Sequence, residues 1–317
     1  MKFNQTIGPL RPPPVIIQGS QPLSVDELRE MARLNRLDAA RMFMAAGNGH
    51  FGSCYSCAEI FATLFFNVLR LDVEMPAWAD RDRFVLSKGH AAPSLYSALI
   101  RRGFMPEHWM DEYEAGVGVK LMTHPSRRYQ SGVDVSTGAL GHGLSLGVGM
   151  ALAAKIDDRD YRSFVLLGDG ELDEGSIWEA AASAAKYKLD NLIAIVDANG
   201  LCVDGTVDKV MPMEPLVDKW TAFGWEVMEL NGHDIPALLS ALDVERGSHS
   251  GKPRVLIART VKGRGVSFME GVRSWHSDVI TPALYQQVLE ELKEPLIHRP
   301  IHIPGRAQEV AIEKVSA

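Results

Sequence analysis

Two short apolar runs separated by one amphipathic segment constrain the fold of this chain more than any other feature. The first run, residues 164–167, leads into Asp169 between two glycines, and the second, residues 192–198, leads into Asn199. Short apolar runs bounded by turn residues predict buried strands, and the pattern between them predicts a helix. The same alternation recurs along the chain. It predicts an α/β fold with a central, mostly parallel sheet and helices on both faces.

The composition divides the chain into three parts. Residues 1–23 contain an RPPP stretch and a Gly-Ser-Gln-Pro cluster, so we expect an extended N-terminal arm. Residues 24–295 carry the strand and helix patterns and form the expected domain. Residues 296–317 are expected to be a C-terminal tail.

Three pairs of serine and glutamate at the spacing of a capping box predict helix starts. The pairs are Ser24 with Glu27, Ser56 with Glu59, and Ser176 with Glu179. Gly47 is expected to end the first helix. His50 then falls in a glycine-flanked loop, and His90 falls at a turn between a short strand and a helix, where a loop can approach a ligand closely.

The charge and hydropathy patterns exclude several classes of protein. The formal net charge is −7, and no run of lysine and arginine is present that would bind nucleic acid. No stretch reaches the roughly 18 apolar residues that cross a membrane, and the first residues lack the apolar segment of a signal peptide. We therefore expect a cytoplasmic protein without a nucleic-acid or membrane partner.

The chain has three cysteines, which are Cys54, Cys57 and Cys202. So few cysteines fit a reducing compartment rather than a disulfide framework. Cys54 and Cys57, together with His50, match the beginning of a zinc or redox site. No second pair of ligands follows, so the interpretation as small residues that pack between helices is favoured.

Asp169 and Asn199 follow neighbouring predicted strands and are expected to meet, because ligands of parallel sheets bind at the carboxyl ends of the strands. A carboxylate, an amide oxygen and a backbone carbonyl suit Mg²⁺ or Ca²⁺, and phosphate oxygens commonly complete the coordination of Mg²⁺. The glycines beside Asp169 leave room for a diphosphate, which the start of the following helix favours. The alternative is that Gly168 and Gly170 only turn the chain and Asp169 begins a helix.

The segment from GDGELDEGSIWEAA to IVDANG resembles the signature of thiamine diphosphate enzymes. This resemblance implies the thiamine diphosphate-binding fold. It also implies that Asp169, Asn199 and the carbonyl oxygen of Leu201 hold Mg²⁺, which Ca²⁺ can replace, and that Gly170 contacts the diphosphate.

Four further stretches resemble transketolases in the same order along the chain. They are RDRFVLSKGHAAPSLYSAL, THP, GVDVSTGALGHGLS and TVKGRGVSFMEGVRSWH. The resemblance implies four catalytic histidines, namely His50, His90, His124 and His276. The residues that it assigns to the cofactor are His90, Gly138, Leu140, Gly170, Glu174, Asn199 and His276.

The implied roles differ among these residues. His50 and His124 would hold the first hydroxyl and the carbonyl region of the donor, His90 would contact the diphosphate and the donor, and His276 would assist proton transfer. Imidazoles suit this work because near neutral pH they both donate and accept protons.

The cofactor's aminopyrimidine is expected to rest against Gly138 and Leu140, and Glu174 is expected at a subunit interface. The remaining histidines are interpreted as surface or core residues: His108, His142, His233, His249, His298 and His302.

Three positions depart from the transketolase pattern. Phe51 stands where proline is frequent, Ala139 replaces a proline, and His142 replaces a glutamine. The first change suggests a different loop shape and donor preference. The other two put the shape of the pyrimidine wall in question.

The resemblance extends only to the first half of a full-length transketolase, without the pyrimidine-binding domain and its essential glutamate. It therefore implies one subunit of a split transketolase, which acts in a heterotetramer with a companion that carries this domain. Such an enzyme transfers a two-carbon glycolaldehyde unit from a ketose phosphate to an aldose. The alternatives are a subunit related to 1-deoxyxylulose phosphate synthase or 2-oxoacid dehydrogenase, an NAD-binding protein that uses GALGHGLSLG, and a non-catalytic partner.

Overall fold

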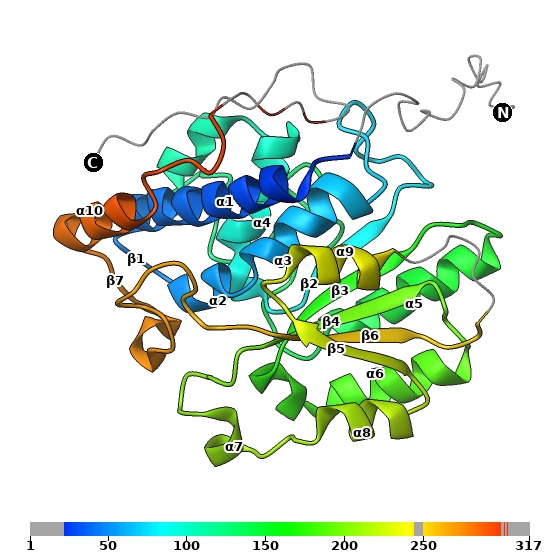
Figure 1. Cartoon of the computed structure of the whole chain (residues 1–317). Coiled ribbons are helices and arrows are strands. Elements are labelled where there is room, and N and C mark those ends of the chain that lie inside the picture. The colour runs from blue at the N-terminus through cyan, green and yellow to red at the C-terminus, as the bar shows by residue number, and fades with distance from the viewer. Residues whose placement is uncertain (1–21, 244–249, 299–300, 302, 304–317) are drawn as a thin grey trace, which may run out of the picture.

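Five parallel strands form the central sheet of the computed structural model, which describes residues 22–243, 250–298, 301 and 303 (Figure 1). Across the sheet the order is β2 (Arg83–Leu86), β3 (Ser163–Gly168), β4 (Leu192–Ala198), β6 (Arg254–Arg259) and β5 (Glu226–Asn231). Every neighbouring pair is parallel. The predicted parallel sheet is thus confirmed.

Helices cover both faces of the sheet, and alternate residues of each strand serve the two layers. On β3, Phe164 and Leu166 join one hydrophobic core, and Val165 and Leu167 join the other. The first core contains α1 (Val25–Ala46), α2 (Phe51–Tyr55), α3 (Ala58–Thr63), α4 (Ala92–Arg102), α9 (Ile235–Leu242) and α10 (Pro282–Glu291). The second contains α5 (Gly143–Ile156), α6 (Gly175–Lys186) and α8 (Leu216–Ala222), and α7 (Val207–Val210) lies near this layer (Figure 1).

Short elements complete the described chain. β1 (Asn48–Gly49) and β7 (Asp278–Val279) form an antiparallel pair. The single-turn helices are Leu64–Val68, Gly89–Ala91, Glu107–Glu112, Gly170–Asp173 and Arg273–His276. No helix in the described ranges is both long and apolar enough to span a bilayer.

The first predicted capping box is confirmed. Ser24 accepts a hydrogen bond from the amide of Glu27, and the Glu27 carboxylate accepts one from the amide of Ser24 at 2.8 Å. The helix ends at Gly47, as predicted, because glycine adopts the left-handed conformation without strain (φ 80°).

The second predicted capping box is wrong. Helix α2 begins directly after His50, and α3 begins after Cys57. Ser56 instead donates a hydrogen bond of 2.6 Å to Asp197, while the Glu59 carboxylate binds Arg36 at 2.7 Å. Charged tertiary partners therefore replace the local cap, because hydrogen bonds to ions are stronger than those between neutral groups.

The third predicted capping box, Ser176 with Glu179, is wrong for a similar reason. Helix α6 begins at Gly175, and the hydroxyl of Ser176 donates to the carbonyl oxygen of Gly141 at 3.0 Å. The serine thus connects the helix to the preceding glycine-rich loop. This connection positions the loop beside Glu174, the residue that precedes the helix.

Most of the expected arm and tail lies outside the described residues, as do His249 and His302. Leu23, at the end of the arm, is buried, and its backbone pairs with the side chain of Asn67. In the tail, Ile301 and Ile303 are fully buried in the core that contains α1.

The three cysteines are free thiols. Cys54 and Cys57 are fully buried among the helices, and burial raises the pKa of Cys54 to about 11. Such a thiol is mostly protonated near neutral pH and reacts slowly. Their surroundings match the interpretation as small packing residues.

Candidate functional site

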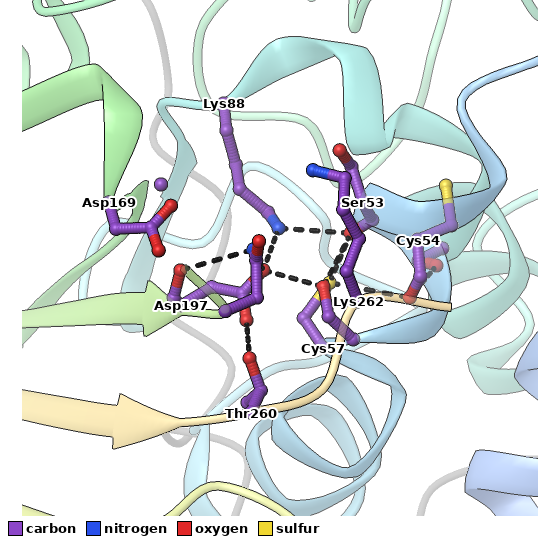
Figure 2. Close-up of polar contacts among 12 residues, drawn as sticks. Ser53, Cys54, Cys57, Lys88, Asp169, Asp197, Thr260 and Lys262 are labelled. Atoms are coloured by element: carbon purple, nitrogen blue, oxygen red, sulfur yellow. Dashed lines mark hydrogen bonds and ion pairs between the residues drawn. The ribbon is translucent and has the colours of Figure 1, made fainter. Parts of the chain in front are cut away.

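The candidate site lies at the carboxyl ends of four neighbouring strands. Lys88 follows β2, Asp169 follows β3, Asn199 follows β4 and Thr260 follows β6. Because the strands are parallel and adjacent, these residues gather at one edge of the sheet. Figure 2 shows the arrangement around Asp197, the last polar residue within β4.

Asp169 connects the ends of β3 and β4. One carboxylate oxygen accepts from the amide of Gly170 at 2.9 Å, and the other accepts from the amide of Gly200 at 2.5 Å. The side chain is buried, and burial together with the nearby charge of Asp197 raises the pKa of Asp169 to about 6. A buried carboxylate beside another carboxylate is stabilised by a cation.

Asn199 and Leu201 add two oxygen atoms next to Asp169. The side-chain oxygen of Asn199 accepts from the amide of Leu201 at 3.1 Å, and the carbonyl oxygen of Leu201 accepts from Nζ of Lys262 at 2.9 Å. The predicted metal ligands are therefore a carboxylate at the end of β3 and two oxygen atoms in the loop after β4, and the Gly200 amide connects the two segments. Three hard oxygen ligands of this kind fit Mg²⁺ or Ca²⁺.

Two buried lysines were missed as site residues by the sequence reasoning. Nζ of Lys88 donates to Asp197 at 2.5 Å and to the carbonyl oxygen of Ser53 at 2.9 Å. Although burial opposes its charge, Asp197 raises the pKa of Lys88. Lys262 has no such carboxylate partner within ion-pair distance among the described residues, and burial together with Lys88 lowers its pKa to about 8.

A lysine directly after an apolar strand was the available sequence signal for Lys88, because buried lysines are rare unless they are paired. Lys262 stands within the stretch TVKGRG, shortly after β6. The ammonium group of Lys88 is balanced by Asp197, so Lys262 supplies the charge that makes this edge of the sheet suitable for an anion. A diphosphate bound with a metal ion has the appropriate charge.

Three of the four predicted histidines cluster beside the lysines. The ring centroids of His50, His90 and His276 are separated by 5.2, 5.8 and 5.3 Å. His50 immediately precedes α2, His90 lies in the turn before α4, and His276 ends a turn before β7. Nε2 of His90 lies 3.0 Å from the hydroxyl oxygen of Ser53, another residue that the sequence reasoning missed.

These three imidazoles are neutral at pH 7. Burial lowers the pKa of all three, and the neighbouring lysine charges contribute. The pKa of His276 falls to about 3, and its buried Nδ1 has no hydrogen-bond partner in the described part of the chain. A neutral imidazole donates a hydrogen bond from one nitrogen and accepts one at the other.

The fourth histidine, His124, reaches the site through Gly138. Gly138 packs against the ring of His124, since a Cβ atom added to Gly138 would lie only 3.3 Å from that ring. Gly89 in turn packs against Gly138, since a Cβ atom added to Gly89 would lie 2.9 Å from the amide nitrogen of Gly138. Gly138 therefore lies between His124 and the turn that carries His90. Burial lowers the pKa of His124, and Glu114 opposes this shift.

The predicted pyrimidine contacts follow Gly138 along the same loop. Leu140 is 37% exposed, so its apolar side chain is accessible. Gly141 packs against Glu174, since a Cβ atom there would lie 2.6 Å from Cβ of Glu174. Leu140 and Glu174 thus share one surface, which also carries the exposed His142.

Phe51 faces the core rather than the site. It is fully buried, and its ring centroid lies 4.3 Å from that of Phe43 and 5.4 Å from that of Trp275. The phenylalanine therefore anchors the loop of His50 from behind. A direct contact with a donor, which would alter the donor preference, is not available to this side chain.

His233 is held by structural partners, as the sequence interpretation expected. Its Nδ1 lies 2.9 Å from the Glu59 carboxylate, and its Nε2 accepts from the amide of Val261 at 2.8 Å. His108 is exposed, and His298 lies at the end of the described domain.

Comparison with known proteins finds the same family by a family model and by individual relatives. The family model described as "Transketolase, thiamine diphosphate binding domain" matches residues 27–302. An apulose-4-phosphate transketolase subunit of Phocaeicola vulgatus is 43% identical over 86% of this chain and 96% of the relative. The 6-deoxy-6-sulfo-D-fructose transketolase subunit SqwG of a Clostridium species is 41% identical over 78% of this chain and 90% of the relative.

The solved structure of transketolase from Campylobacter jejuni superposes with a TM-score of 0.79 at 30% identity. The match covers 89% of this chain but 45% of the Campylobacter chain. The chain thus spans less than half of that longer protein, whereas it spans nearly all of the two relatives above.

Proposed function

Because the chain belongs to the transketolase family, we propose that it is the cofactor-binding subunit of a two-chain transketolase. The enzyme transfers a two-carbon glycolaldehyde unit from a ketose phosphate donor to an aldose acceptor. One observation carries the proposal: the neutral histidine cluster lies at the same sheet edge as the oxygen ligands of Asp169, Asn199 and Leu201. The relatives that are named as transketolase subunits support this assignment over the other thiamine diphosphate enzymes and the NAD-binding alternative.

The metal ligands in this proposal are the carboxylate of Asp169, the side-chain oxygen of Asn199 and the carbonyl oxygen of Leu201. They fit Mg²⁺, with Ca²⁺ as a substitute, because all three are hard oxygen ligands. The raised pKa of Asp169 supports the assignment, since a bound cation would stabilise the buried charge. Nζ of Lys262 donates to the carbonyl oxygen of Leu201, so a positive charge lies beside the proposed ligands and the diphosphate they would hold.

When bound, thiamine diphosphate supplies the carbanion that attacks the ketose carbonyl and carries the two-carbon unit. The residues of this chain bind and orient it. Gly170 offers a position without a side chain at the start of a helical turn, and the charge of Lys262 acts on both Asp169 and His90. Gly138 and Leu140 would support the aminopyrimidine, with Glu174 beside them.

In this proposal the histidines bind the oxygen atoms of the donor and transfer protons. His50 and His124 would hold the hydroxyl and carbonyl region of the donor, because neutral rings both donate and accept hydrogen bonds. His276 would assist proton transfer, since its ring lies in the same cluster as His50 and His90. The buried setting keeps these rings uncharged until a proton is transferred.

A companion chain would complete the site. Leu140 and Leu146 are 37% and 38% exposed, and exposed apolar side chains of this kind favour association. The companion would bring the pyrimidine-binding domain, its glutamate and most contacts to the sugar phosphate. We propose a cytoplasmic heterotetramer, in which residues 24–295 form the cofactor-binding domain, residues 1–23 an arm and residues 296–317 a tail.

Thiamine diphosphate titration of the natively purified assembly tests the proposal. Saturable binding should require Mg²⁺ and both chains, and it should precede transfer of the two-carbon unit. Binding of NAD, decarboxylation of a 2-oxoacid, or the absence of cofactor binding in the assembly would contradict it.

A further inference from the structure

Asp197 collects hydrogen bonds from four parts of the fold. It is fully buried within β4 and accepts from the ammonium group of Lys88 at 2.5 Å, from the hydroxyl of Ser56 at 2.6 Å, and from the hydroxyl of Thr260. The fourth donor is the side-chain amide of Asn199, whose Nδ2 lies 3.1 Å from Oδ2 of Asp197. In Figure 2 the contacts from Lys88 and Thr260 converge on Asp197.

The carboxylate of Asp197 determines which end of the Asn199 amide faces it. Its partners on the other elements are an ammonium group and two hydroxyls, which all donate to it. An ionised carboxylate only accepts hydrogen bonds, so the atom of Asn199 next to it must be the NH₂ nitrogen. Rotation of the amide by half a turn would place oxygen against oxygen.

The same contact leaves the amide oxygen of Asn199 on the opposite side. There Oδ1 accepts from the backbone amide of Leu201 and joins the proposed metal ligands. Groups behind a metal ligand often orient it in this way, and their loss lowers metal affinity.

We propose that Asp197 is a positioning residue that directs the amide oxygen of Asn199 toward the metal, while Lys88, Ser56 and Thr260 hold the Asp197 carboxylate in place. The inference rests on the proposed metal site. The inference states that metal binding also requires Asp197, although this residue would contact neither the metal nor the substrate.

A purely structural role for the Lys88–Asp197 pair makes a different prediction. Replacement of a buried ion pair by apolar residues of similar volume is often neutral or stabilising, whereas removal of one partner leaves an unpaired charge. The double variant Lys88→Met with Asp197→Leu should therefore fold. If the pair only supports the fold, this variant should bind metal as the wild type does.

The test measures Mn²⁺, as a probe for Mg²⁺, by electron paramagnetic resonance in the assembly saturated with thiamine diphosphate. The double variant should have a dissociation constant for Mn²⁺ about 10 to 100 times that of the wild type. A matched control is Arg81→Met with Asp134→Leu. That pair has side chains that are 8% and 5% exposed, and Asp134 binds the amide of Phe84 at the opposite end of β2.

A further substitution distinguishes orientation from general damage. Asn199→Asp replaces the amide by a carboxylate with two equivalent oxygens, which needs no orientation. In the apolar double variant it should restore Mn²⁺ affinity. In the wild-type background, Asn199→Asp places a second carboxylate beside that of Asp197. The affinity for Mn²⁺ should therefore rise less than in the double variant, or fall.

The outcomes separate the inference from the proposed function. If the wild-type assembly does not bind Mn²⁺, the metal site itself is wrong. If the wild type binds and the double variant binds equally well, the positioning role of Asp197 is overturned. Should the double variant fail to fold, Thr260→Val keeps the ion pair and loosens the carboxylate. It should raise the dissociation constant to a smaller extent, and an unchanged value would likewise overturn the inference.

Discussion

The ammonium group of Lys262 lies 2.9 Å from the carbonyl oxygen of Leu201, so a cationic side chain contacts a proposed metal ligand. The lysine is 2% exposed, and burial together with the charge of Lys88 lowers its pKa to about 8. This contact indicates that the loop after β4 presents its oxygen atoms to positive charge. The assignment of a metal ion to these oxygen atoms, and of a diphosphate beside Lys262, depends on this arrangement of oxygen atoms and positive charge.

Asp169→Ala should abolish the Mg²⁺-dependent retention of thiamine diphosphate, because the site loses its charged ligand. Retention is measured by gel filtration followed by quantification of the cofactor. The control is Asp173→Ala, which removes an exposed carboxylate from the adjacent turn and should leave retention unchanged. Equal retention in both variants would rule out Asp169 as a metal ligand.

His124→Ala should leave cofactor binding intact and slow donor cleavage by about 10²- to 10⁴-fold, the usual contribution of a positioned acid or base. Single-turnover kinetics with a ketose donor provides the measurement. His108→Ala, which removes an exposed histidine outside this loop, is the matched control. An equal loss of cofactor binding and cleavage would show that His124 is structural.

The free energy of unfolding should decrease as the pH falls from 6.5 toward about 3, the lowered pKa of His276. In this range the unfolded chain binds a proton that the folded chain excludes, so acid favours unfolding. The slope from one such group is at most about 1.4 kcal/mol per pH unit, and solvent screening reduces it because the ring is partly exposed.

Chemical denaturation of His276→Gln across this range is the measurement for His276. The variant should lose part of the pH dependence, and His298→Gln, which removes a histidine outside the cluster, should keep it. An unchanged slope in His276→Gln would contradict the buried neutral state of this ring.

Leu146→Asp should weaken assembly with the companion chain, because it introduces a charge at an exposed apolar position of α5. Analytical ultracentrifugation of the purified assembly measures the effect. Ile156→Asp is the control, since Ile156 is 74% exposed at the other end of α5. Dissociation by the control alone would place the interface elsewhere.

The sequence was sufficient to predict the parallel sheet and the edge at which Asp169 and Asn199 meet. Apolar runs such as those of β3 and β4 are fully buried strands, so their pattern reflects burial on both faces. The residues that follow them, Asp169 and Asn199, gather because parallel neighbours end at the same edge. Such arguments depend on local patterns, which a single sequence contains.

The interior polar contacts were not predictable from local patterns. Asp197 appeared as part of an apolar run, yet its partners Ser56, Lys88 and Thr260 are 141, 109 and 63 residues distant along the chain. The capping boxes at Ser56 and Ser176 failed for the same reason, because tertiary acceptors competed for the serine hydroxyls. Pairings between distant segments are determined by the assembled fold.

The most direct test of the central claim follows a ketose phosphate labelled with ¹³C at its first two carbons. The natively purified assembly should move both labelled carbons to an aldose acceptor, and transfer should require Mg²⁺, thiamine diphosphate and the companion chain. If the chain purifies without a companion and no assembly that contains it moves the label, it is not a subunit of a two-chain transketolase.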